Sequence, residues 1–243
     1  MITSKANIIE QLQKEILSLQ GFKTRAKKNA VDNGLGAINH AFPNSVFPLG
    51  AIHEFIASTA EDKAASLGFI AGLLSSGLKN NNAAIWISGS GNIFPPALQS
   101  FGIAPDKIIF LKLNKEKEIL WAMEEALKYE GLSAVICEVK ELSFLASRRL
   151  QLAVEKSQVT GFVLQCNPRV INTTACICRW KITALPTALA DEMPGVGFPR
   201  WQVHLLKVRN GRPGNWQLEW VAGRFRHINA VPAIVVMPKK KTG

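Results

Sequence analysis

Short apolar runs alternate with longer helical segments through most of this chain, and that alternation constrains its fold more than any other feature. The apolar runs cover residues 50–56, 83–87, 107–113, 134–139 and 161–166. The segments between them have helical character over about 62–78, up to Gly102, and over 115–129 and 144–157. Strands that are apolar on both faces and alternate with helices are typical of a mostly parallel sheet covered on both sides. The sequence therefore predicts an α/β fold.

The two ends of the chain have a different character. Residues 6–20 form an amphipathic helical pattern with Leu12 on its apolar stripe, and a polar, basic stretch follows at 23–29. Residues 201–209 and 216–221 alternate apolar and polar side chains around a turn rich in glycine, which predicts a β-hairpin. We predict three parts: an N-terminal helix and basic linker at 1–30, a core ending in the hairpin at 31–222, and a basic, flexible tail at 223–243.

Positive charge is concentrated in the last third of the chain. The net charge is +11, of which residues 161–243 supply +9, from 12 basic and 3 acidic residues. Such a segment attracts phosphate backbones or an acidic protein, although a merely soluble basic surface explains the charge equally well. No apolar run approaches the length of a membrane-spanning helix, and the N-terminus does not resemble a signal peptide. We expect a cytoplasmic, nucleoid-associated protein.

The cysteines and histidines show no metal-binding or disulfide pattern. The four cysteines lack a C-x-x-C pair, and Cys176 and Cys178 fit one strand with both side chains on the same side. The four histidines lack zinc-ligand spacing. We expect reduced, mostly buried thiols, no metal and no cofactor.

A degenerate phosphate-binding loop follows the first predicted strand. The segment from Ala57 to Ala64 has the length of the pattern G-x-x-x-x-G-K-[ST], and Lys63 occupies the lysine position. Ala57 and Asp62 replace the two glycines, and Ala64 replaces the hydroxyl residue that would bind Mg²⁺. Without the second glycine the backbone amides are poorly presented to a phosphate, and Glu61 and Asp62 add negative charge. We expect Lys63 to be a solvated lysine and ATP hydrolysis to be lost.

The segment Phe47–Phe55, the degenerate loop and the order of elements resemble the core of the RecA recombinase superfamily. Within it, residues 199–220, which read PRWQVHLLKVRNGRPGNWQLEW, resemble the ImuA family of RecA-like accessory proteins of the bacterial mutagenesis cassette, sometimes described as SulA-like. The resemblance covers about residues 31–221. It implies a RecA-like core.

Most of the residues that RecA-like enzymes use are replaced at the matching positions. The resemblance places Ser90 where the superfamily has a catalytic glutamate, and Glu138 where an acidic residue ends a core strand. The connections at 139–144 and 167–175 are short where RecA-like recombinases carry longer DNA-binding loops. The resemblance therefore implies a scaffold without hydrolytic machinery.

Several basic residues are candidates for binding DNA or a partner protein. Arginines interleave with tryptophans in the hairpin, where we assign the tryptophans to the core and the arginines to a binding rim. A solvated helix face is an equal alternative for the paired arginines of 144–157, and a solubilising tail is an alternative for the last lysines. The candidates are Arg148, Arg149, Arg200, Arg209, Arg212, Arg224, Arg226, Lys239, Lys240 and Lys241.

The resemblance implies an adaptor in SOS-induced, error-prone translesion DNA synthesis. Its implied partners are an ImuB-type polymerase-like protein, RecA and, indirectly, an error-prone replicative-type DNA polymerase, with DNA as a further candidate. The N-terminal helix could also mediate self-association. Two alternatives remain open: a weak DNA-dependent ATPase of the RecA superfamily that depends on Lys63, and a SulA-like inhibitor of cell division.

Overall fold

The computed structural model describes residues 12, 34–77, 82–89, 95–187 and 197–228 of the chain. The helix and linker predicted at 1–30 lie outside the described residues apart from Leu12, and the end of the predicted tail lies outside them as well.

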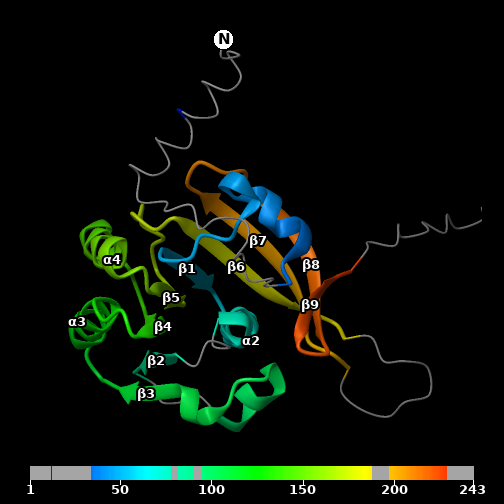
Figure 1. Cartoon of the computed structure of the whole chain (residues 1–243), viewed down its shortest axis with the longest axis horizontal. Helices are drawn as coiled ribbons and strands as arrows, with labels where there is room; N and C mark the ends of the chain where they lie inside the picture. The colour runs from blue at the N-terminus through cyan, green and yellow to red at the C-terminus, as the bar shows by residue number, and fades with distance from the viewer. Residues whose placement is uncertain (1–11, 13–33, 78–81, 90–94, 188–196, 229–243) are drawn as a thin grey trace, which may run out of the picture.

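The described residues form a single mixed sheet with helices on both of its faces (Figure 1). The strand order is β3-β2-β4-β5-β1-β6-β7-β8-β9, parallel from β3 to β6 and antiparallel from β6 to β9. The elements are η2 (Gly36–Ala41), η3 (Pro43–Ser45), β1 (Ile52–Ala57), α2 (Ala60–Gly77), β2 (Ala83–Ser88), η5 (Pro95–Phe101), η6 (Pro105–Lys107), β3 (Ile108–Lys112), α3 (Glu116–Leu127), β4 (Leu132–Val139), α4 (Phe144–Ser157), β5 (Thr160–Cys166), β6 (Cys178–Leu185), β7 (Arg200–Val208), β8 (Gly214–Val221) and β9 (Arg224–His227). The predicted α/β architecture is confirmed.

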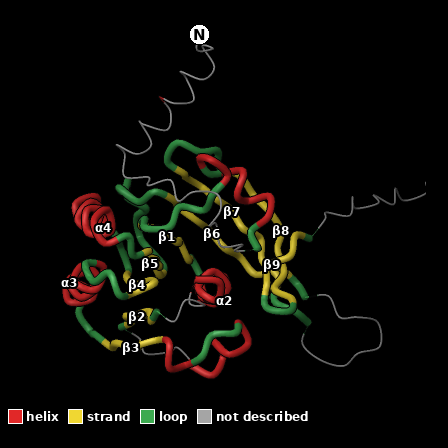
Figure 2. Tube along the Cα trace, viewed as in Figure 1, coloured by secondary structure: helices red, strands yellow, loops and turns green. Residues whose placement is uncertain are grey.

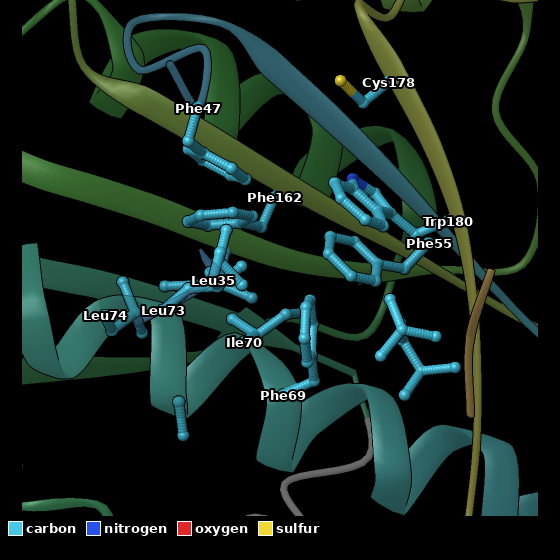
Figure 3. Packing of buried hydrophobic residues seen from close by; sticks show 14 of the residues in the cluster. Leu35, Phe47, Phe55, Phe69, Ile70, Leu73, Leu74, Phe162, Cys178 and Trp180 are labelled. Carbon is cyan, nitrogen blue, oxygen red and sulfur yellow. The ribbon is translucent and has the colours of Figure 1, made fainter. Parts of the chain in front are cut away.

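Helix α2 covers one face of the sheet, and α3 and α4 cover the other (Figure 2). The burial pattern explains this arrangement, because all six residues of β1 are buried, as expected for a central strand covered on both sides. The α2 side carries the larger core, where Phe55, Phe69 and Trp180 pack together (Figure 3). Trp201 and Phe225 extend this aromatic core to β7 and β9.

Two strands differ from the sequence prediction. A strand was predicted only around Cys176 and Cys178, whereas β6 begins at Cys178 and runs to Leu185, where it joins the parallel half of the sheet to the antiparallel half. Strand β9 lies inside the segment predicted as a tail, so the ordered core extends to His227 and the boundary at 222 is wrong. The reason is Phe225, which is 4% exposed and packs between Phe69 and Trp220, whereas the arginines on either side of it are exposed.

Cys137, Cys176 and Cys178 are buried and Cys166 is partly buried, in line with the expectation of mostly buried thiols, but Cys176 and Cys178 do not share a side. Cys178 lies in the α2-side core, whereas Cys176 precedes β6 and lies in the core beneath α3 and α4. Burial raises the pKa of Cys166 to about 11 and that of Cys176 to about 12, so both thiols stay protonated near neutral pH.

A buried ionic network connects β1, β5 and β6. Glu54 is fully buried and accepts hydrogen bonds from Arg179 Nε at 2.7 Å, from the Thr174 hydroxyl at 2.8 Å and from the Gln165 amide. Arg179 also donates to the carbonyl of Asn172 at 2.5 Å, which ties down the connection between β5 and β6. This network fixes the position of the segment that leaves the carboxyl end of β5.

A second buried polar residue on β1 is His53. Its Nε2 donates to the carbonyl of Pro48 at 2.8 Å, and its Nδ1 accepts from Trp180 Nε1 at 3.4 Å. The ring stacks on Phe47 with centroids 4.5 Å apart. Desolvation by burial outweighs the Pro48 hydrogen bond and lowers the pKa of His53 to about 4.

This pKa makes stability depend on pH between about 4 and 6.5. In that range the unfolded chain binds a proton at His53 and the folded chain does not, so stability is complete above pH 6.5 and falls as the pH decreases. We expect the wild type to lose about 2 to 3 kcal/mol more than His53→Gln between pH 7 and pH 4.5, measured by urea unfolding. The exposed His40 provides the control, because His40→Gln should keep the wild-type slope. Equal slopes for wild type and His53→Gln would contradict this assignment.

Candidate functional site

The degenerate loop is shorter in space than its sequence pattern suggests. Strand β1 ends at Ala57 and helix α2 already begins at Ala60, so only Ser58 and Thr59 connect them. The residues that align with the second half of a phosphate loop, including Lys63, therefore belong to the first turn of α2.

The backbone amides at this turn are bonded within the chain. The Asp62 amide donates to the Thr59 hydroxyl at 3.1 Å, and the Ser58 amide donates to the Asp62 carboxylate at 3.2 Å. The Lys63 amide donates to the Thr59 carbonyl at 3.0 Å. Hydrogen bonds from its own backbone amide and from Thr59 lower the pKa of Glu61. Carboxylates of the chain itself therefore take the place that an anion would occupy at a helix N-terminus.

Lys63 forms an ion pair with Glu138 across the carboxyl edge of the sheet. Lys63 Nζ lies 2.6 Å from Glu138 Oε2, with the Lys63 side chain 25% exposed and the Glu138 side chain 5% exposed. Trp86 Nε1, on the neighbouring strand β2, donates to Glu138 Oε1 at 3.3 Å. Both oxygens of Glu138 are thus engaged, and Lys63 is paired rather than solvated as the sequence had suggested.

The structure brings together only part of the predicted site. Lys63 and Glu138 meet, whereas Ser90 lies outside the described residues. The connection from β4 to α4 is residues 140–143, and that from β5 to β6 is residues 167–177, so both are short. These connections lie side by side, because Asn172 donates to the Leu142 carbonyl at 3.4 Å and the Ala175 amide donates to the Ser147 hydroxyl at 2.9 Å.

The paired arginines of α4 both have carboxylate partners. Arg149 lies 2.6 Å from Glu124 on α3, and Arg148 lies 3.8 Å from Glu155 on its own helix. Since these contacts compensate their charges, the α4 pair is a weaker candidate for phosphate binding than the sequence suggested.

The arginines of the antiparallel strands are distributed over different environments. Arg200 and Arg226 both pair with Glu219, which is itself only 3% exposed. Arg209 donates to the carbonyl of Ala175 at 3.0 Å, whereas Arg212 and Arg224 are exposed. Lys239, Lys240 and Lys241 lie outside the described residues and stay predictions. Trp201 and Trp220 are buried and Trp216 packs against the core, in agreement with the assignment of the tryptophans.

Sequence reasoning missed two residues that shape this site. Thr59 caps α2 and closes the loop, and the spacing Thr59-x-x-Asp62 resembles a capping box that could have signalled this. Trp86 holds Glu138, and nothing in the sequence links these two residues, because the contact depends on the pairing of β2 with β4.

Two features are absent from the described ranges 34–77, 82–89, 95–187 and 197–228. No helix there combines the length and apolar character needed to cross a bilayer. No group of three or more His, Cys, Asp or Glu side chains there is placed to hold a metal ion.

Comparison with known proteins gives two informative similarities, although no family model matches the chain. It is 32% identical over 209 residues to Protein ImuA of Caulobacter vibrioides strain NA1000 / CB15N, covering 81% of this chain and 85% of that protein. Protein ImuA of strain ATCC 19089 gives the same values. The crystal structure of the RadB recombinase aligns with a TM-score of 0.57 and 13% identity, covering 82% of this chain and 100% of that one, which confirms the RecA-like fold.

The Lys63 pair should contribute to stability. Lys63→Ala leaves Glu138 buried without its cation, and we expect the free energy of unfolding to fall by about 2 kcal/mol. This loss is smaller than that for breaking a fully buried ion pair, because Lys63 is partly exposed to solvent. A double-mutant cycle with Glu138→Gln should give a coupling of about 1 kcal/mol or more. Lys115→Ala, which removes an exposed pair with Glu118, is the control and should cost less than about 0.5 kcal/mol. Additive effects of the two substitutions would contradict the coupling.

Proposed function

Because the chain belongs to the ImuA family, we propose that it acts as a non-catalytic, RecA-like adaptor in SOS-induced, error-prone translesion DNA synthesis. Family membership supports the accessory role in mutagenesis. The observation that carries the non-catalytic part of the proposal is the ion pair between Lys63 and Glu138, which joins two positions that an ATPase of this fold would direct toward nucleotide.

The residues at the loop do not fit a Mg²⁺-bound nucleotide. A phosphate cradle needs several unbonded amides directed at the anion, yet the amides of Ser58, Asp62 and Lys63 are bonded within the turn. Ala64 has no hydroxyl to bind a cation, and Glu61 and Asp62 would repel phosphate. Glu138 accepts from Lys63 and Trp86 rather than holding a free carboxylate for water. No catalytic step is therefore assigned to this site.

We further propose that the adaptor binds an ImuB-type polymerase-like protein and RecA, and through them an error-prone replicative-type DNA polymerase. Exposed apolar side chains at the carboxyl edge of the sheet support a protein contact, because Phe144 and Leu145 begin α4 beside Val170 and Ile171 of the β5–β6 connection. These four side chains are each 51% or more exposed. They lie on or directly after the two short connections, where the resemblance to RecA-like recombinases would place longer loops, and their apolar character suits a protein better than a phosphate backbone.

A complementation experiment tests the non-catalytic role. A strain that lacks the gene receives the wild type or the double variant Lys63→Met with Glu138→Gln, which removes both charges together and keeps an acceptor for Trp86. We expect both to restore the same damage-induced mutation frequency, because the proposed role needs no nucleotide turnover. The measurement is the frequency of resistant colonies after ultraviolet irradiation, with protein levels checked by immunoblot.

The proposal is contradicted if the double variant gives only the mutation frequency of the empty-vector strain while the cells contain normal amounts of the variant protein. That result would favour an ATPase.

A further inference from the structure

The antiparallel strands β6 to β9 have one face in the core and one polar face. Trp180, Trp201 and Trp220 are directed into the α2-side core. The alternate positions form the other face, which we call the basic sheet face. Its polar residues are Arg179, Lys181, Thr183, Arg200, Gln202, His204, Lys207, Asn215, Gln217, Glu219, Arg224 and Arg226. Three apolar residues also lie on it: Leu185 opposite Arg200, Val221 opposite Arg224, and Leu206, which is 48% exposed.

The strand register brings these side chains into rows across the sheet. Arg200 lies opposite Glu219, which lies opposite Arg226. In the next row, Gln202 lies opposite both Thr183 and Gln217, and the Gln217 amide donates to the Gln202 side chain at 3.1 Å. His204 lies between Lys181 and Asn215, and Lys207 lies opposite Arg179. Rows rich in cations therefore alternate with a row of uncharged amides.

The face carries an excess of positive charge. Arg179 is compensated by the buried Glu54, and Glu219 is shared by Arg200 and Arg226. Lys207 donates to the Thr174 carbonyl at 2.7 Å, a neutral partner that leaves its charge in place. The neutral pair of Arg179 with Glu54 is left out of the count. The strands then carry one carboxylate, that of Glu219, and five cations, which are Lys181, Arg200, Lys207, Arg224 and Arg226.

Solvent reaches this face. Helices α3 and α4 pack on β1, β2, β4 and β5. Beyond them the polar positions of β6 to β9 are mostly part-exposed or exposed, and the Arg226 side chain reaches 65% exposure. Figure 1 shows that β7 to β9 extend away from α3 and α4.

The chemistry of the face suits phosphate better than an acidic protein. Stable protein interfaces are organised around buried aromatic or apolar anchors, whereas the tryptophans of these strands are directed into the core. Interfaces with nucleic acid are more polar and more positive, and phosphate contacts need only cations and amides. No Trp, Tyr or Phe side chain is directed outward from β6 to β9, so bases have no large stacking platform there.

We propose that the basic sheet face binds the sugar-phosphate backbone of nucleic acid without reading the bases. For its biological setting the inference rests on the adaptor role proposed above, since an adaptor that holds DNA directly would keep its partners at the damaged template.

The test is equilibrium binding of the full chain to a labelled oligothymidylate and to a labelled mixed-sequence strand over a range of salt concentrations. Five phosphate contacts predict a slope of log affinity against log salt of about −3 to −4 for single strands, equal for the two sequences. The double variant Lys181→Gln with Arg224→Gln removes two contacts, so it should reduce the magnitude of the slope by about 1.4 and weaken binding of both strands equally. The matched control, Lys117→Gln with Lys140→Gln, removes the same charge from exposed positions elsewhere and should bind as the wild type.

Three results would overturn the proposal. The first is strand binding that is unchanged in the Lys181 and Arg224 variant, and the second is an equal loss in the control. The third is binding of labelled polyglutamate that matches the DNA in affinity and in its dependence on Lys181 and Arg224, which would identify the face as a site for an acidic protein. None of these results depends on Lys63 or Glu138, so failure here is distinguishable from failure of the adaptor proposal.

Discussion

A buried glutamate on the central strand joins the two halves of this protein. Strand β1 lies in the parallel half beside β6, the strand at which the antiparallel extension begins, and Glu54 on β1 is bonded to groups from β5, from β6 and from the segment between them. A buried carboxylate without its cation would be strongly destabilising, so Arg179 and the Thr174 hydroxyl must stay in place. This requirement holds residues 167–177 against the sheet and sets the direction in which β6 to β9 leave the core.

The ion pair between Lys63 and Glu138 connects α2 to β4 at the carboxyl edge of the sheet. A helix N-terminus beside a parallel strand is a natural anion site, and here the chain's own carboxylates and one lysine fill it. The scaffold therefore keeps the RecA-like shape while its surfaces change. Apolar side chains occupy the carboxyl edge, and cations occupy the open face of the antiparallel strands. In our account the fold serves binding, with separate surfaces for protein and for nucleic acid.

The sequence predicted the parallel half well because strands buried on both faces are unbroken apolar runs, as in 161–166. It placed a strand at Cys176 and Cys178 but did not extend it through β6, although the alternation of Arg179 and Lys181 with Trp180 and Ile182 is a clear strand signal. It missed β9, where Phe225 alone indicates burial. The loss of the phosphate loop was readable from Ala57, Asp62 and Ala64. Its replacement by an ion pair was not, because Lys63 and Glu138 are far apart in the chain and meet only through the sheet.

Direct measurement of nucleotide binding tests the central claim of this account. Isothermal titration of the full chain with ATP and Mg²⁺, with and without single-stranded DNA, should give no saturable heat at millimolar ATP, and phosphate release should stay at background. Saturable binding with turnover that DNA stimulates and that Lys63→Ala abolishes would contradict the account, because it would show that the pair with Glu138 opens to admit nucleotide.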